Sequence, residues 1–288
     1  MIGAEIVRVE SDAISAELLP AIGARLHRLR AFGHDLLRTP EDPATHASDP
    51  FFWGAYVLAP WANRVHAGPM RAAGRPVDLP ANFSDGSAIH GQVYDRAWHH
   101  DGWRFTIAAG GDGWPWRYEV EARVAAEART LRLAYTLLNR SDAPMPAGLG
   151  LHPWWRQPVE VAIAGRSVYP TTTDSPPMPE SVAGRFDRRA LEPMPHGIDA
   201  AWTDLDDPAV ELRWPDAGVG LTMRAATTPE LHVVVASPPD VDAVAVEVQT
   251  HAPQGLRRLE HDEPGALAVI DPGSALSLTI ELIARRVP

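Results

Sequence analysis

A two-residue alternation of apolar and polar side chains constrains this chain more than any other feature of its sequence. It is clearest in segments 118–124, 131–137 and 276–282, where every second residue is apolar and the residues between are polar or small. Successive side chains of a strand point to opposite faces of a sheet. The pattern therefore predicts antiparallel strands with one face in a core and the other toward water.

Further strands are predicted at 6–9, 14–18, 105–108, 159–163, 210–214, 219–223, 231–236 and 244–248. No segment shows a sustained helical stripe, and 22 Gly and 28 Pro punctuate the strands at short intervals. Many short strands without helical partners predict an all-β fold, a large antiparallel β-sandwich. Alternation continues on both sides of the proline-rich stretch 170–179. We therefore expect residues 1–288 to form one domain in which this stretch is a long surface loop.

Two amino acids are missing from the chain, and each absence excludes chemistry. There is no Cys, so thiolate nucleophiles, zinc–thiolate sites and disulfides are excluded. There is also no Lys, because all 26 basic residues are Arg. Schiff-base enzymes, pyridoxal enzymes and Walker-type phosphate loops require a lysine. Any catalysis must therefore use His, Asp, Glu, Tyr, Ser, Thr or Arg.

The formal charge of −11 argues against nucleic acid and anionic membranes as partners. No apolar run reaches the roughly 18 residues of a membrane-spanning helix. The first five residues do not resemble a signal peptide, so a cytoplasmic location is expected. The twelve His raise the question of a metal, but His99 and His100 would point to opposite faces of a strand. No HExxH or EF-hand spacing occurs, and no metal is predicted.

Two residues stand out as candidates for acid–base chemistry. Glu247 lies in an alternating segment where it shares a face with Ala245 and Gln249, and this face meets either solvent or a cleft. His152 follows two glycines and precedes Pro153 and two tryptophans. Glycine permits close approach of a ligand or another backbone, and tryptophan offers a flat apolar face of the kind on which sugars pack. A buried core histidine explains the same pattern equally well.

Polar residues beside Gly or Pro form a second, weaker set of candidates. Asn63 and Arg64 follow the segment Leu-Ala-Pro-Trp-Ala, and His90 precedes Gly91. Asp199 lies in a stretch that also holds Asp204, Asp206 and Asp207. Taken singly, each of these residues is explained by an ordinary role in a loop.

Taken in order, these segments resemble the aldose 1-epimerase (galactose mutarotase) family from about residue 5 to about residue 285. The resemblance is carried by six segments in order along the chain: LAPWANR at 58–64, IHG at 89–91, GWPW at 113–116, GLHPWW at 150–155, VEVQT at 246–250 and DPGS at 271–274. Trp154-Trp155 replaces the Tyr-Phe that is frequent in the family, and Gln92 replaces a second Gly. The resemblance implies a galactose mutarotase-like supersandwich that carries a sugar cleft on one sheet.

The resemblance also implies the roles of the candidate residues. Glu247 and His152 would form the catalytic pair, and Asn63, Arg64, His90 and Asp199 would hold sugar hydroxyls. Glu247 as carboxylate would take the proton of the C1 hydroxyl while His152 as imidazolium protonates the ring oxygen, without a cofactor. Because each charge favours the other, we expect the rate to fall at acidic pH as Glu247 is protonated and at alkaline pH as His152 is deprotonated.

Three other functions are compatible with the sequence. A non-catalytic carbohydrate-binding or sugar-sensing module would use the same cleft without turnover. A hexose-6-phosphate 1-epimerase would need an arginine cluster, for which Arg64, Arg71 and Arg75 are candidates. A two-carboxylate glycosidase would need Asp199 as its second carboxylate. The expected partner is a small sugar, and the chain would be a monomer or a homodimer.

Overall fold

The structure, a computed structural model, describes residues 5–66, 68–170 and 178–288, and its regular secondary structure is almost entirely β-strand. The described strands are β1 (Val7–Glu10), β2 (Ile14–Leu19), β3 (Arg25–Ala31), β4 (His34–Asp35), β5 (Ala55–Leu58), β6 (Arg64–His66), β7 (Gly68–Ala72), β8 (Arg75–Leu79), β9 (Ser87–Ile89), β10 (His99–Asp101), β11 (Arg104–Gly111), β12 (Trp114–Glu127), β13 (Thr130–Asn139), β14 (Met145–Ala147), β15 (Gly150–Arg156), β16 (Glu160–Pro170), β17 (Glu180–Ser181), β18 (Glu192–Pro193), β19 (Asp199–Trp214), β20 (Val219–Thr227), β21 (His232–Ala236), β22 (Ala243–Gln249), β23 (Ala268–Ile270) and β24 (Ala275–Arg286). Two short α-helices lie between strands: α1 (Thr45–Ser48) between β4 and β5, and α2 (Gly255–Glu260) between β22 and β23.

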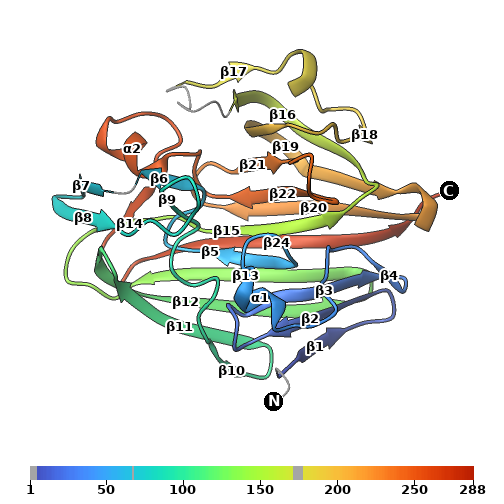
Figure 1. Ribbon diagram of the computed structural model, residues 1–288, viewed down its shortest axis with the longest axis horizontal. Helices are drawn as coiled ribbons and strands as arrows, with labels where there is room; N and C mark the ends of the chain where they lie inside the picture. Colours follow the sequence, from blue (N-terminus) through green and yellow to red (C-terminus); the bar gives the residue numbers. More distant parts are fainter. Residues whose placement is uncertain (1–4, 67, 171–177) are drawn as a thin grey trace.

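One continuous antiparallel sheet organises the molecule (Figure 1). Neighbouring strands run in the order β10, β11, β12, β13, β24, β20, β19, β21, β22, β15, β5, β3, β2 and β1. The two ends of this path come together, because β1 contacts β12 and β2 contacts β13. The sheet is therefore curled on itself and encloses the main core, which confirms the predicted all-β antiparallel fold.

Every strand predicted from alternation overlaps a strand of the structure, as β12, β13 and β24 show most clearly, although the predictions for β1, β16 and β21 begin one residue early. The strands that alternation missed include β3, β5 and β15. In β5 all four residues are buried, and in β15 only Arg156 is exposed. A strand covered on both faces carries no polar alternation. Burial on both faces thus explains why β5 and β15 were not detected, and these two strands carry Tyr56 and His152 of the candidate site.

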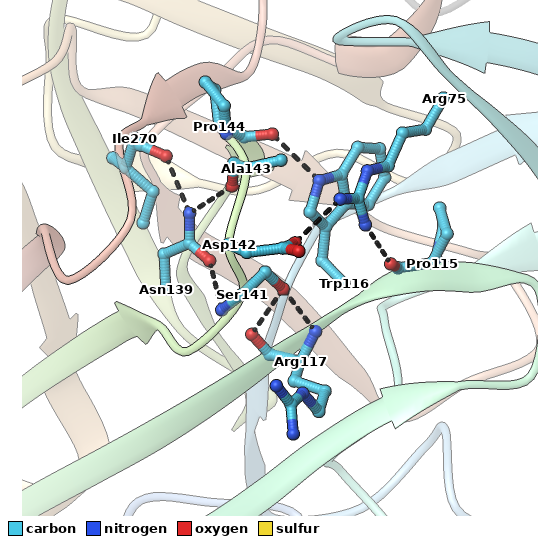
Figure 2. Close-up of polar contacts among 10 residues, drawn as sticks. All are labelled: Arg75, Pro115, Trp116, Arg117, Asn139, Ser141, Asp142, Ala143, Pro144 and Ile270. Atoms are coloured by element: carbon cyan, nitrogen blue, oxygen red, sulfur yellow. Dashed lines mark hydrogen bonds and ion pairs between the residues drawn. The ribbon is translucent and has the colours of Figure 1, made fainter.

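A network of hydrogen bonds fixes the path of the chain from β13 into β14 (Figure 2). The Asn139 side chain donates to the carbonyls of Ala143 and Ile270, at 2.8 and 3.0 Å. The Trp116 indole donates to the Pro144 carbonyl at 2.8 Å. Each bond satisfies a polar group that leaves water on folding, and so the turn after β13 is held in one conformation.

Of the stretch 170–179, which was predicted to be a surface loop, residues 171–177 lie outside the described residues. Pro170 ends β16, and β17 begins at Glu180. Within residues 5–66, 68–170 and 178–288, neither helix has the length and apolar character needed to cross a bilayer.

Candidate active site

A cavity of about 340 Å³ opens on the face of the sheet formed by β5, β15, β22 and β21. All six candidate residues from the sequence line it, although they come from five separate segments of the chain. The lining residues are Phe51, Phe52, Tyr56, Asn63, Arg64, Phe83, Ile89, His90, His152, Trp154, Gly197, Ile198, Asp199, Val234, Ala236, Ser237, Pro238, Asp240 and Glu247.

Strand β22 carries Glu247 into the cavity by the alternation seen in the sequence. Val244, Val246 and Val248 point into the main core, whereas Ala245 packs on the opposite side with the residues around Tyr56. Glu247 shares the side of Ala245 and lines the cavity, but only 2 % of it is exposed. Of the two alternatives that the sequence left open for this carboxyl, the structure shows the cleft and not open solvent.

Strand β15 places His152 beside this carboxyl. It pairs with β22 on one edge and with β5 on the other, where His152 lies opposite Tyr56. The imidazole Nε2 lies 3.1 Å from Oε1 of Glu247. Gly150 permits this close packing, because a Cβ there would lie 3.0 Å from the Leu58 side chain and 3.1 Å from Cβ of Gln249.

Aromatic rings hold the imidazole of His152 on several sides. Tyr56 stacks on it with ring centroids 4.6 Å apart and an angle of 23° between the planes. His90 meets it edge-on at 4.9 Å and 87°, and Trp154 lies 5.2 Å away. Such contacts restrict rotation of the ring. Nε2 therefore remains directed at Glu247 instead of sampling other positions.

Tight backbone geometry brings His90 and Asn63 to the cavity. Both residues have positive φ, 64° for His90 and 56° for Asn63. The His90 amide donates to the Asn63 carbonyl at 3.2 Å, and β6 pairs with β9 next to them. Gly91 follows with φ of +77°, and a Cβ there would lie 1.9 Å from the Ala59 carbonyl oxygen. Only glycine fits this contact, which explains the His-Gly order.

A buried polar chain behind the cavity fixes the Asn63 side chain. Its Nδ2 donates to Oε1 of Gln249 at 2.8 Å, and Nε2 of Gln249 donates to the His251 carbonyl at 2.7 Å. The His251 ring lies 2.7 Å from the Ala252 carbonyl through Nδ1 and accepts the Ala62 amide at Nε2. His251 is thus the neutral tautomer with its proton on Nδ1, and burial lowers its pKa to about 4.

Gln249 and His251 support the site but were not among the residues predicted from the sequence. A signal for Gln249 was present, since it shares the strand face of Glu247 and therefore had to lie beside it. No local signal marks His251, because its partner Ala62 is remote in the chain and only the fold brings the two together.

The remaining candidates line the cavity at its charged side. Arg64 forms an ion pair with Asp85, with 2.8 Å between Nε and Oδ2, and its guanidinium lies over the Phe83 ring. Asp199 begins β19 opposite Ala236 of β21. Asp240 also lines the cavity. The lining therefore holds the carboxyl groups of Asp199, Asp240 and Glu247 against one guanidinium.

Burial controls the protonation of the central pair. It raises the pKa of Glu247 well above 4.5, and the charge of Asp199 adds to this effect. It also lowers the pKa of His152 to about 3, with a further contribution from the Arg25 charge. The expectation that both partners are charged is therefore wrong for the ligand-free protein, because desolvation outweighs their mutual attraction.

Burial likewise holds the pKa of His90 well below 6.5, and the nearby charges of His152 and Arg64 act in the same direction. His90 is therefore neutral and able both to donate and to accept a hydrogen bond. Among the residues that line the cavity, the buried side-chain atoms without a hydrogen-bond partner are Nδ1 of His90, Nδ1 of His152 and Oε2 of Glu247. Across the described ranges, no group of three His, Asp or Glu side chains is arranged as metal ligands. His99 and His100 lie on β10, where His100 contacts Glu5.

The curled antiparallel sheet, with a cavity of polar and aromatic lining on one face, places this chain in the class of galactose mutarotase-like folds. A galactose mutarotase-like protein from Clostridium acetobutylicum superposes with a TM-score of 0.84 at 15 % identity, and the match covers 99 % of this chain and 96 % of that one. An aldose epimerase homologue from C. elegans gives 0.81 at 16 % identity, covering 99 % and 100 %. A galactose 1-epimerase from Lactobacillus acidophilus gives 0.72 at 17 % identity, covering 98 % and 94 %.

The sequence itself identifies the family. The aldose 1-epimerase family model matches residues 6–282, and the chain belongs to that family. This confirms the resemblance found in the sequence. A search of curated proteins gave no match.

Proposed function

We propose that this protein is an aldose 1-epimerase that interconverts the α and β anomers of a free, uncharged aldohexose. The observation that carries the proposal is the contact of 3.1 Å between Nε2 of His152 and Oε1 of Glu247 inside the cavity. The hydroxyl oxygen O1 and the ring oxygen O5 of a pyranose are bonded to the same carbon. A proton acceptor and a proton donor that serve them must therefore be near neighbours, as these two groups are.

The reaction needs two proton transfers. Glu247 takes the proton of the C1 hydroxyl, the C1–O1 bond becomes a carbonyl, and the C1–O5 bond breaks. The released O5 receives the proton of Nε2 of His152. The open-chain aldehyde rotates about C1–C2, and the reverse transfers close the ring on the other face of C1. Protons and electrons balance within the cycle, and the two residues return to their starting state.

The buried pair reaches its reactive form without exchanging protons with water. In the ligand-free protein the shared proton resides on Glu247, because burial disfavours both charges. Its movement along the 3.1 Å contact gives carboxylate and imidazolium with the same total number of protons. Sugar hydroxyls that donate to the carboxylate then replace the solvation lost on burial and stabilise this form.

The other lining residues have complementary tasks in this proposal. Arg64, His90, Asn63 and Asp199 hold hydroxyl groups, and a hydroxyl both donates and accepts. The rings at the cavity, including Trp154 and Phe52, offer apolar faces to the C–H surface of the sugar. Fixed partners on both kinds of surface orient C1 toward the catalytic pair before reaction.

The arginine contacts favour an uncharged sugar over a phosphorylated one. Arg71 donates to the Gly74 carbonyl at 2.6 Å, and Arg75 binds the Pro115 carbonyl and Asp142 (Figure 2). Neither of them lines the cavity. Arg64 does, but it already pairs with Asp85, and the carboxyls of Asp199 and Asp240 would repel a phosphate.

Polarimetry tests both parts of the proposal. Fresh α-D-glucose or α-D-galactose should equilibrate faster with enzyme than without it. The value of kcat/KM should be at least about tenfold lower for glucose 6-phosphate than for glucose, because the carboxylates of Asp199 and Asp240 repel the phosphate. Binding of the free sugars without faster equilibration would instead support the sugar-binding module. Faster turnover of the phosphorylated sugar would support the hexose-6-phosphate epimerase.

A further inference from the structure

One wall of the cavity is a short segment between α1 and β5 that contributes the side chains of Phe51 and Phe52. The backbone carbonyls of residues 50–53 each accept a hydrogen bond from a side chain. The Phe51 carbonyl accepts from the Tyr56 hydroxyl at 3.1 Å and from the Trp154 indole. The Phe52 carbonyl accepts from Arg38 at 2.7 Å. A loop held through its backbone presents its side chains in a fixed position.

Arg25 on β3 supplies the remaining anchors of this wall. Its Nη2 donates to the Pro50 carbonyl at 2.9 Å, and its Nη1 donates to the Trp53 carbonyl at 3.5 Å. The same guanidinium contacts Nδ1 of His46 at 3.1 Å and the Tyr94 carbonyl at 3.1 Å. Arg25 thus contacts both ends of the two-phenylalanine wall as well as the helix that precedes it.

Arg25 also lies behind the catalytic histidine. Its guanidinium sits 4.8 Å from the ring centroid of Tyr56, and Tyr56 stacks on His152. Arg25 is fully buried and does not line the cavity. Burial lowers its pKa to about 10, so it remains charged at neutral pH. A buried charge is costly unless it forms hydrogen bonds, and Arg25 donates to the carbonyls of Pro50, Trp53 and Tyr94.

We propose that Arg25 is a positioning residue that holds the Phe51–Phe52 wall against the sugar and thereby sets the affinity of the enzyme for its substrate. The proposal rests on the proposed function, because the wall matters only if a sugar occupies the cavity. It assigns no contact with substrate to Arg25 itself. The effect passes through the carbonyls of Pro50 and Trp53 and through the ring of Tyr56.

The decisive variant is Arg25→Lys, which keeps the charge but cannot bridge several carbonyls with one planar group. We expect KM to rise about tenfold while kcat changes little, because the catalytic pair is untouched and the wall is looser. The matched control is Arg188→Lys. Arg188 is also buried and donates to two carbonyls, those of Glu192 and Pro193, and none of the three lines the cavity. The KM of Arg188→Lys should stay at the wild-type value.

Amide hydrogen exchange of residues 46–54 gives a readout that needs no activity. Arg25→Lys should exchange faster there than wild type, and Arg188→Lys should not. Should Arg25→Lys fail to fold, Tyr56→Phe removes the hydroxyl that donates to the Phe51 carbonyl and should raise exchange in the same segment.

Unchanged KM together with unchanged exchange in a folded Arg25→Lys would overturn the proposal. So would an equal rise of KM in Arg188→Lys, or unchanged exchange in Tyr56→Phe if that is the variant that folds. If wild type anomerises no sugar, the proposed function fails, and the exchange data still decide whether Arg25 holds the wall.

Discussion

His152 and Glu247 lie on adjacent antiparallel strands with Nε2 and Oε1 3.1 Å apart, and only 5 % and 3 % of their side chains are exposed. Two ionisable groups so close and so deeply buried titrate as a unit, not as separate residues. Desolvation keeps the unit neutral in the ligand-free protein, which has consequences for activity, for its pH dependence and for stability.

Replacing Glu247 by Gln should lower kcat by ~10²–10⁴-fold, the usual contribution of a positioned acid–base group. The amide keeps the shape of the carboxyl but cannot take a proton. Stability at pH 7 should not fall, because the pKa of Glu247 is raised by burial and its ionisation opposes folding. Polarimetry and thermal unfolding measure the two effects. Glu281→Gln is the control, since Glu281 pairs with Arg132 on β13, outside the cavity. A near-wild-type rate in Glu247→Gln would disprove the catalytic role of Glu247.

The pH dependence of kcat/KM should differ from that of two independent groups. The shared proton is lost only at a pH above the ordinary pKa of a glutamic acid, since burial raises the pKa of Glu247. A second proton binds His152 with a pKa of about 3. We therefore expect the rate to be level from pH 7 down to about pH 5.5 and to fall on the alkaline side. Stopped-flow polarimetry checks this, and a rate that drops between pH 7 and pH 5.5 in folded protein would contradict it.

Stability should fall steeply in mild acid because several buried histidines resist protonation. Burial lowers the pKa to about 2, 3, 3 and 4 for His46, His152, His232 and His251, and well below 6.5 for His90. The unfolded chain binds protons at these groups from about pH 6.5 downward, whereas the folded chain does not. Stability is therefore present above pH 6.5 and is lost as the pH falls, by up to ~1.4 kcal/mol per pH unit for each group.

Urea unfolding at pH 7.5, 6.5 and 5.5 measures this loss. His232→Gln should make the dependence on pH shallower, since both ring nitrogens of His232 are buried without a hydrogen-bond partner and its protonation is suppressed. Equal midpoints at pH 7.5 and 5.5 in the wild-type protein would show that these groups are not neutral in the folded state.

Gln249→Leu should raise KM by about tenfold, because the Asn63 side chain is no longer held in place and the enzyme binds the sugar less tightly. The change removes the acceptor of Asn63 Nδ2 and the donor to the His251 carbonyl. Thr250→Val is the matched control, because Thr250 is an equally buried neighbour that loses one bond to the Leu149 amide. Saturation kinetics on both variants measure KM. Equal KM values for Gln249→Leu and Thr250→Val would show that Gln249 does not support the site.

Local pattern identified the long alternating strands of the main sheet and missed β5 and β15, which are buried on both faces. The segments around Leu133 and Leu278 were identified because one face of each meets water. β15, which carries His152, has six buried residues in succession and gives no periodic signal. The motifs, taken in order along the chain, identified His152 where periodicity did not. They made Asn63, Arg64, His90 and Glu247 candidates together with His152, and in the structure all five line one cavity.

The sequence by itself determined the fold class, the family and the residue types available for chemistry, because alternation, ordered motifs and missing amino acids are properties of the chain. Only the tertiary structure decided the protonation of His152 and Glu247, the hydrogen bonds that support Asn63, and the position of the Phe51–Phe52 wall. The pKa of Glu247 depends on desolvation by neighbours from remote segments, and the contacts of Arg25 with Pro50 and Trp53 arise where β3 meets the segment before β5. Such through-space effects have no local signature, since electrostatic and packing energies depend on distance in the folded protein and not on separation along the chain.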